Sequence, residues 1–345
     1  MRSVKLLGII MLLVFSFNIV AVFAEVQMTD YASVINPSEI VWTGKKFLVA
    51  SNEDNATKLY SINPQTKTIE RFASTFAGVS EVHFVSSSGA EFPREYVYAS
   101  AGRTISEISP LGDTVRVFVT LGTDSEIAGL AFDNRGYWNY NLLAVAYDGS
   151  VWEINKLGSA TNIANVGAGV STGGVVVARD EYGDFSGTLL VSMVNKTVLS
   201  VDHKEHKVSV LATLPEIPGL IMYTPSSNDL YLAKASSGKI VQLDRDFLQD
   251  YLAQILVIST NSDGKSTSMF SIKSARAGVN VTKIATINES DIVGATFVND
   301  NELNAAIQGI IDEETTDLNP LIIIIPILVA VIIVVAFVLY KYRGF

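Results

Sequence analysis

The sequence contains no cysteine, and this absence excludes disulfide bonds, cysteine-ligated zinc, iron–sulfur clusters and thiol catalysis together. Charged residues are also scarce: they make up 17% of the chain, against about 25% in an average globular protein, which argues against disorder. Basic residues number 25 against 35 acidic ones, and phosphate repels a surface with the resulting net charge of −10. The composition therefore favours a folded protein with no nucleic-acid partner.

An apolar segment opens the chain. Residues 1–24 begin with the basic Arg2 and Lys5, continue as an apolar run and close with Ala-Val-Phe-Ala at Ala24. This is the pattern of a secretory signal peptide that is cleaved after a small residue. An uncleaved N-terminal anchor is the alternative.

A second apolar segment lies near the other end. Residues 321–340 contain no charge and, as a helix, would cover about 30 Å, the thickness of the bilayer core. The preceding linker, 312–320, is acidic, whereas the short tail 341–345 carries Lys341 and Arg343. Because basic residues stay on the cytoplasmic side, the pattern predicts a single-pass type I protein of the cell membrane with its ectodomain, 25–311, outside the cell.

The ectodomain is rich in short apolar runs typical of β-strands, and these runs recur as an internal repeat. Every 41 to 49 residues an apolar strand closes on a small residue, and a polar turn and another strand follow. A strand that opens with Glu or Gly precedes each of these units. The small residues that close the repeated strands are Ala50, Ala99, Ala146, Ser192 and Ala233. Four strands recurring at this period predict an all-β fold of the β-propeller type, beside one C-terminal transmembrane helix.

The blade number follows from the repeat length. At 41 to 49 residues per blade, the ectodomain holds six or seven blades. The interval from Gly219 to Gly294 is too long for one blade and short for two. We favour six blades with an insertion around residues 246–285, and seven blades is the alternative. Residues 30–34 are expected to form an outer strand that closes the ring, which leaves no long unpaired sheet edge.

The repeat resembles a known group of propellers. The segments Gly129–Phe132, Asn141–Ala146 and Asp148–Ile154 follow the rhythm of six-bladed propellers of the NHL and gluconolactonase-like type. The resemblance covers most of residues 36–310 and implies a six-bladed ring. In the lactonases a metal site of Glu, Asn and Asp faces the channel, but no residues here can be assigned to it. The NHL consensus Asp-x-x-Asn-x-Arg is not matched either. Propellers serve many functions, so the fold does not decide this one.

Three loops share a Ser-Glu-Ile/Val sequence, which places Glu39, Glu81 and Glu126 at equivalent positions. In a propeller the loops that enter first strands and leave second strands surround one channel mouth. Converging carboxylates there would bind Ca²⁺ or form an acid/base pair. The alternative is that they are solvated loop ends or pair with basic residues such as Arg103. The same mouth could hold a ligand without any metal.

Two further residues are candidates for ligand binding. His83 lies two residues after Glu81, so it is either a buried core histidine or a general base paired with Glu81. Trp138 stands in an aromatic turn, 134–140, that could form an exposed binding edge, although a tryptophan of a propeller is more often core between blades. The other two histidines, His203 and His206, belong to a charged hairpin between a third and a fourth strand.

Short motifs add little chemistry. No nucleophile elbow, P-loop, His-Glu-x-x-His or dinucleotide fingerprint occurs. Four Asn-x-Ser/Thr sequons on the exported side are candidate glycosylation sites: Asn55, Asn195, Asn280 and Asn288.

These observations favour a membrane-anchored propeller at the cell surface that acts as a non-catalytic binding or scaffold module for an envelope protein or a glycan. The alternative is an extracellular metal-dependent hydrolase of the lactonase type, or a sugar dehydrogenase, with its site at the channel mouth. The lining of the channel discriminates between them. Three or more carboxylate or amide oxygens around one point favour the enzyme, and apolar or small residues favour the binding module.

Overall fold

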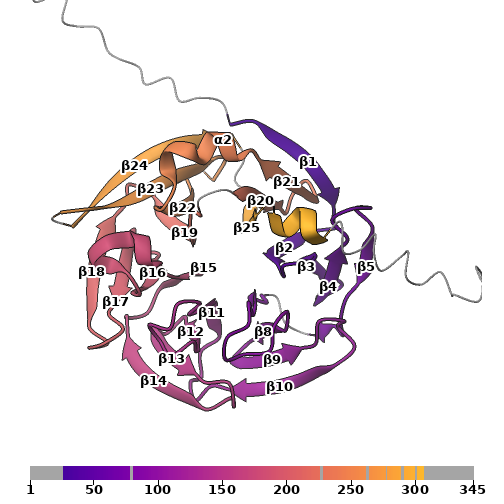
Figure 1. The fold of residues 1–345 in the computed structure, drawn as a ribbon, viewed down its shortest axis with the longest axis horizontal. Helices are drawn as coiled ribbons and strands as arrows, with labels where there is room; N and C mark the ends of the chain where they lie inside the picture. Colours follow the sequence, from indigo (N-terminus) through magenta and orange to yellow (C-terminus); the bar gives the residue numbers. More distant parts are fainter. Residues whose placement is uncertain are drawn as a thin grey trace, which may run out of the picture.

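Six antiparallel sheets stand around a common axis in a computed structural model of the chain (Figure 1). The structure describes residues 26–306 apart from 78–80, 226–227, 262–263, 277, 289–290 and 300. Five sheets have four strands, and the sheet containing β2 has a fifth. The six-bladed propeller that the repeat predicts is confirmed, and the alternative of seven blades is wrong.

The first four blades are consecutive in sequence, each running from an innermost first strand to an outer fourth strand. Their bounds follow. Blade 1 comprises β2 (Pro37–Trp42), β3 (Phe47–Glu53), β4 (Ala56–Ile62) and β5 (Ile69–Arg71), with β6 (Phe76–Ala77) also paired to β4. Blade 2 comprises β7 (Phe84–Ser86), β8 (Val97–Ala101), β9 (Thr104–Ile108) and β10 (Val115–Thr120). Blade 3 comprises β11 (Ile127–Phe132), β12 (Leu142–Ala146), β13 (Ser150–Ile154) and β14 (Ala160–Asn165). Blade 4 comprises β15 (Val170–Val177), β16 (Leu189–Met193), β17 (Thr197–Val201) and β18 (Val208–Thr213).

Blades 5 and 6 are interleaved. Blade 5 is built from β19 (Ile217–Tyr223), β22 (Ile255–Thr260), β23 (Thr267–Ala275) and β24 (Gly278–Ile287). Blade 6 is built from β25 (Ile292–Asn299), β20 (Asn228–Lys234), β21 (Lys239–Leu243) and β1 (Met28–Ser33). After β19 the chain therefore crosses to blade 6 for one hairpin and returns to blade 5 through α2 (Arg245–Leu248) and η2 (Gln249–Tyr251).

This topology corrects the expected insertion. Residues 246–285 are not an addition to the ring, because they include three strands of blade 5. The repeated small residue Ala233 does lie in a second strand, as the repeat indicates, but that strand belongs to blade 6. The expected closing strand is confirmed: β1 pairs antiparallel to β21, with Ala32 opposite Ile240, so the N-terminal strand completes the last blade.

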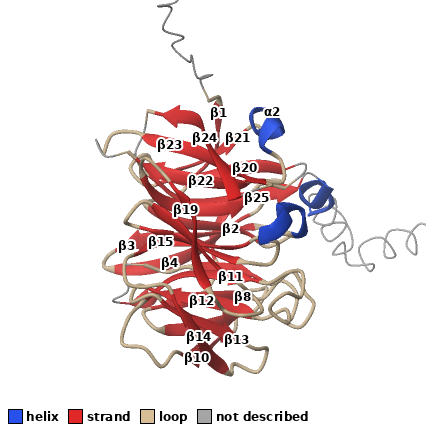
Figure 2. Cartoon of the chain, turned by 90° about the vertical axis from the view of Figure 1, so that its left-hand side faces the viewer, coloured by secondary structure: helices blue, strands red, loops and turns tan. Residues whose placement is uncertain are grey.

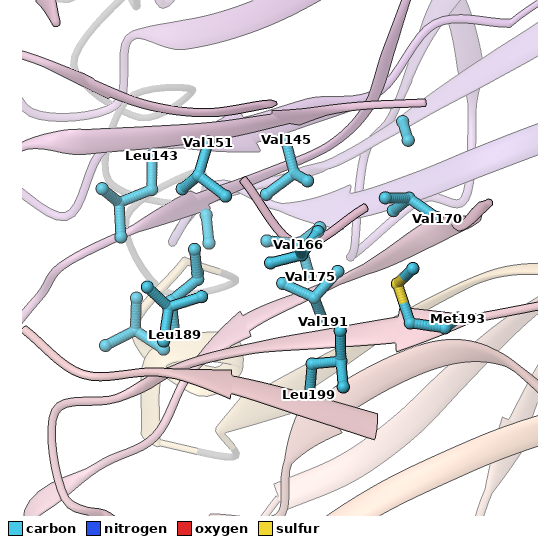
Figure 3. Close-up of a cluster of buried hydrophobic side chains, with 14 of the residues drawn as sticks. Leu143, Val145, Val151, Val166, Val170, Val175, Leu189, Val191, Met193 and Leu199 are labelled. Carbon is cyan, nitrogen blue, oxygen red and sulfur yellow. The ribbon is translucent and has the colours of Figure 1, made fainter. Parts of the chain in front are cut away.

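Apolar side chains between neighbouring blades form the core. The second strands β12 and β16 are buried at every residue, whereas no residue of the outer strand β14 is fully buried. A second strand packs against a neighbouring blade on both faces, so it reads as a continuous apolar run. Figure 3 shows one such layer, in which Val145 and Val151 of blade 3 meet Val175 and Val191 of blade 4.

Two faces of the ring are distinguished by the direction of the first strands. We call the face where they begin the upper face and the face where they end the lower face. Turns and helices that follow first or third strands lie on the lower face, including η1 (Asp180–Phe185), α2, η2 and a helical segment at 301–306. The side view in Figure 2 shows the helices gathered on one side of the ring.

The two predicted membrane-directed segments, 1–24 and 321–340, lie outside the described residues. Within the part of the chain that the structure describes, no helix is long and apolar enough to span a bilayer.

Candidate functional site

A cavity of about 970 Å³ occupies the upper mouth of the channel. Its walls come from the loops that enter first strands and leave second strands, as expected for a propeller. All six blades supply residues to it, and one from each of the first five is Ser38 of blade 1, His83 of blade 2, Tyr147 of blade 3, Thr172 of blade 4 and Gly219 of blade 5. Blade 6 adds Ile292 and Val293.

The channel continues below this mouth. A narrower cavity of about 150 Å³, the waist of the channel, is lined by Glu39, His83, Gly173 and Leu220. His83 and Leu220 also line the upper cavity, so the two cavities adjoin there. A cavity of about 590 Å³ opens on the lower face, where Arg179 and Glu302 line it. His83 and Glu39 therefore lie where the wide upper mouth narrows to the waist.

Glu39 and His83 form a pair across the boundary between blades 1 and 2. The Nδ1 atom of His83 lies 3.3 Å from Oε2 of Glu39, and the two side chains are only 7% and 13% exposed. The other carboxylate oxygen accepts a hydrogen bond of 3.3 Å from the backbone N–H of Ile40. The backbone of His83 is fixed by Ser100, whose N–H donates to the His83 carbonyl at 2.7 Å. Among the described residues, no lysine or arginine forms an ion pair with Glu39.

Three buried polar atoms in the wall of the upper cavity have no hydrogen-bond partner in the described structure. They are Nε2 of His83, Oγ of Ser38 and Oγ of Ser171, and they come from blades 2, 1 and 4. Buried polar atoms are normally paired, because an unpaired donor or acceptor costs about 1–3 kcal/mol. All three atoms belong to residues that line the same cavity.

A second polar group lies higher in the mouth. The Tyr147 hydroxyl donates a hydrogen bond to Glu81 and lies 2.7 Å from Oγ1 of Thr172. Burial raises the pKa of Tyr147 above its ordinary value, and the carboxylates of Glu81 and Glu126 raise it further. Tyr147 therefore stays protonated and holds Glu81 at the rim.

His83 is buried, as the first of its two expectations has it, and the alternative pair with Glu81 is not seen. His83 precedes β7 rather than lying within a strand, so the alternation of strand faces does not apply to it. Its ring instead meets Glu39 on the first strand of the neighbouring blade. The shared Ser-Glu sequence located both glutamates, but nothing in it distinguishes the one that reaches the histidine.

Glu126 and Arg103 lie away from the cavity lining. Glu126 is exposed, and Arg103 donates hydrogen bonds to the Thr123 carbonyl at 3.0 Å and to Asp124 at 3.3 Å. In the described part of the chain, no three His, Asp or Glu side chains are grouped closely enough to hold a metal ion. The expected gathering of Glu39, Glu81 and Glu126 around one cation is thus not seen there.

Trp138 corrects the expectation of an exposed binding edge. Its side chain is 1% exposed, its indole N–H donates to the Gly187 carbonyl at 2.8 Å, and its ring stacks on His206. The buried carboxylate of Asp133 folds the aromatic turn inward by accepting hydrogen bonds from four backbone N–H groups of residues 135–140. Trp138 is therefore core on the lower side of blades 3 and 4. The hairpin containing His206 is confirmed between β17 and β18.

The four sequon asparagines, Asn55, Asn195, Asn280 and Asn288, are all exposed. Asn55 and Asn195 lie in turns between second and third strands on the upper face, whereas Asn280 lies in the outer strand β24. Their exposure leaves room for a glycan, and modification remains a prediction.

Comparisons with known proteins bear on the fold alone. No protein-family model matches the chain, and no curated protein sequence matches it. Among solved structures, the chain is similar to that of a TolB-like protein from Agrobacterium tumefaciens, with 13% sequence identity and a TM-score of 0.49. The match covers 75% of this chain and 84% of that one.

Proposed function

We propose that this protein is a propeller-shaped binding module whose ligand enters the upper mouth of the channel. The lining of the cavity carries the proposal. One side is built from small or apolar residues such as Gly169, Val170, Pro218, Leu220 and Ile258, and the cavity has the volume of a ligand site. Polar residues lie between these apolar ones, among them His83 and Tyr147 of blades 2 and 3 and Glu216 of blade 5.

The location proposed from the sequence fits this role. A cleaved signal peptide and a span at 321–340 would hold the ring outside the cell membrane as a type I protein, with the ligand supplied by an envelope protein or a glycan. Exposed sequons on the upper face are compatible with such a site.

Site-specific photo-crosslinking in intact cells tests the proposal. A photoreactive amino acid replaces Val194, which is 52% exposed in the cavity wall, and a matched variant carries it at Leu157 on the lower face. We expect a discrete adduct from position 194 and none of the same mass from position 157. Thr172→Trp, which fills the mouth, should remove the adduct. An adduct that appears equally from both positions, or survives Thr172→Trp, would contradict the proposal.

The Glu39–His83 pair favours one second candidate, the extracellular hydrolase of the lactonase type. A histidine held by a carboxylate, with its other nitrogen at a cavity, can act as a general base toward water. The described residues provide no three-ligand metal site for such an enzyme. Hydrolysis of δ-valerolactone by the purified protein, with and without Ca²⁺, decides between the two. Turnover that disappears in His83→Gln would establish the hydrolase, and no turnover leaves the binding module.

A further inference from the structure

The carboxylate of Glu39 is largely buried at the base of the upper cavity, and no lysine or arginine of the described residues forms an ion pair with it. It has two hydrogen bonds of 3.3 Å, one from Ile40 N–H and one with His83. Burying a carboxylate is costly unless a positive charge or strong hydrogen bonds compensate it. Two lysines near the mouth have partners of their own. Lys196 donates a hydrogen bond to the Pro215 carbonyl at 2.9 Å, and Lys283 forms an ion pair with Glu216 at 3.4 Å.

The polar atoms around Glu39 are suited to a hydrogen-bond donor. Because Nδ1 of His83 faces a carboxylate, the neutral ring carries its proton on Nδ1 and presents the lone pair of Nε2. Ser38 and Ser171 add two hydroxyl oxygens that can accept hydrogen bonds, and none of the three atoms has a partner in the described structure. An ammonium group has three donors, no acceptor and a positive charge. It would therefore supply donors to acceptors of this kind and a charge opposite to that of the carboxylate.

The opposite wall defines the rest of the ligand. Beside the polar Glu216, Thr260 and Asn261 of blade 5, blades 5 and 6 line the cavity with six apolar side chains: Ile217, Pro218, Leu220, Ile258, Ile292 and Val293. Apolar groups that a ligand buries against these side chains favour binding through the hydrophobic effect. Glu81 stands at the rim of the same mouth, so a cation is attracted to it and an anion is repelled.

We propose that the upper cavity recognises an ammonium group attached to an apolar body, with the ammonium at Glu39, His83 and the two serines. This inference rests on the proposed function and specifies the chemistry of its ligand. The ammonium can belong to a free amine or to the N-terminus of an apolar polypeptide, and a cavity of about 970 Å³ has room for either.

Three ring compounds of nearly equal shape test the chemistry: cyclohexylamine, cyclohexanol and cyclohexanecarboxylate. Binding to the purified full-length protein is followed by saturation-transfer NMR at neutral pH. We expect the amine to bind at least tenfold more tightly than the alcohol, and the carboxylate not to bind. Glu39→Gln should weaken binding of the amine to the level of the alcohol. Glu205→Gln, which removes the same charge from an exposed turn of blade 4, should leave both affinities unchanged.

Thermal unfolding of the same variants separates binding from structure. Removing an uncompensated buried charge should leave the Tm of Glu39→Gln equal to or above that of the unmodified protein. A lower Tm together with unchanged preference for the amine would show that Glu39 is structural and overturn the inference. Equal binding of amine and alcohol, abolished for both by Thr172→Trp, would overturn the inference but retain the binding module. Failure of all three compounds to bind, with no crosslink from position 194, would overturn both.

A peptide pair identifies the source of the ammonium. Ile-Val-Leu-amide and its N-acetylated form differ only at the terminal amine. Tighter binding of the free peptide than of cyclohexylamine indicates a polypeptide ligand, and weaker binding indicates a free amine. Equal binding of the free and acetylated peptides would contradict the role of the ammonium.

Discussion

At the scale of single residues, glycine sets how closely the first strands approach the axis. A Cβ atom added to Gly174 would lie 2.9 Å from the Gly219 carbonyl oxygen, and one added to Gly294 would lie 2.8 Å from Cα of Glu39. Both contacts are with the backbone of the next blade, and both distances are shorter than a Cβ atom tolerates without a shift of its neighbours. Close packing of neighbouring blades therefore explains the glycines at positions 174 and 294.

Gly294→Ala should both destabilise the ring and disturb the site. The added methyl group must displace the β2 backbone at Glu39, and overpacking of this kind costs about 1–3 kcal/mol. The free energy of unfolding from denaturant titration should fall by that amount, and binding of cyclohexylamine should weaken. Gly122→Ala is the matched control, since its Cβ meets only the tip of the Trp152 side chain, at 3.3 Å. Equal losses in the two variants would contradict this account.

Asp148 gives the upper face a defined pH dependence. Burial raises the pKa of its carboxyl, but hydrogen bonds from Thr123 at 2.7 Å and from the Ser150 hydroxyl and N–H lower it more, so the net pKa lies below the ordinary value. A depressed folded-state pKa stabilises the protein above the unfolded-state pKa of about 3.9 and loses that effect as pH falls through the folded value.

Asp148→Asn should therefore cost about 1 kcal/mol of unfolding free energy at pH 7, a value reduced for solvent exposure. The difference from the unmodified protein should shrink as the pH is lowered below about 4. The exposed Asp184→Asn, which removes the same charge elsewhere on the ring, serves as the control. A cost that stays constant between pH 7 and pH 3 would show that the charge of Asp148 does not contribute.

The sequence predicts which residues lie at the channel mouth better than it predicts which residues they contact. Glu39, Glu81 and His83 do line the channel because the repeat fixes where each first strand begins. The partner of His83 depends on the spacing between two blades, which no local pattern encodes. Trp138 was misplaced for a related reason: its burial follows from four backbone hydrogen bonds to Asp133, and a turn sequence does not show which side chain will accept them.

At the scale of elements, the second strands were predicted well and their assignment to blades less so. A second strand is sandwiched between blades, so its apolar run is recognisable in any blade. The β20–β21 hairpin satisfies the same pattern whether it pairs with β19 or with β25. Only the long-range pairing of β20 with β25 assigns it to blade 6, and that pairing spans residues 228 to 299.

Engineered cysteine pairs test the interleaved topology. The chain has no cysteine of its own, so no native thiol can form a competing disulfide. Asn228 lies opposite Asn299 across β20 and β25, and Ile217 lies opposite Thr260 across β19 and β22. We expect Asn228→Cys with Asn299→Cys, and Ile217→Cys with Thr260→Cys, to form disulfides under mild oxidation.

The control combines one cysteine from each pair, so that the two residues do not lie opposite each other. The first pair lies at the lower ends of its strands and the second at the upper ends, so Asn228→Cys with Thr260→Cys should stay reduced. Formation of that disulfide, or failure of both direct pairs in a folded protein, would show that β20–β21 does not belong to blade 6. Peptide mapping after proteolysis measures each product.

At the scale of the whole molecule, the two faces of the ring differ in what they carry. The cavity opens on the upper face. The helical segment at 301–306 packs on the lower face, where the Trp42 indole N–H donates to Glu302 at 3.1 Å and Ala306 is buried beside Trp42. The chain therefore leaves the ring on the side opposite the cavity, 14 residues before the predicted span at 321–340.

This arrangement predicts an orientation at the membrane. If residues 321–340 span the bilayer, the shortest path turns the lower face toward the lipid and the cavity away from it. The turns between third and fourth strands on the lower face also present apolar side chains, and Leu157 is 84% exposed at one of them. An exposed leucine beside Lys156 suits the interface between headgroups and acyl chains.

Fluorescence quenching in vesicles measures that orientation. A fluorophore is attached to Leu157→Cys on the lower face or to Val194→Cys on the upper face of the full-length protein, reconstituted with a quencher on the lipid headgroups. Both side chains are exposed and apolar, so the two labelled proteins differ mainly in their distance from the bilayer. Quenching should be strong at position 157 and weak at position 194, and equal exposure to an aqueous quencher in detergent shows that both labels are accessible. Stronger quenching at position 194 would mean that the cavity faces the membrane, and a ligand would then have to come from the lipid rather than from outside the cell.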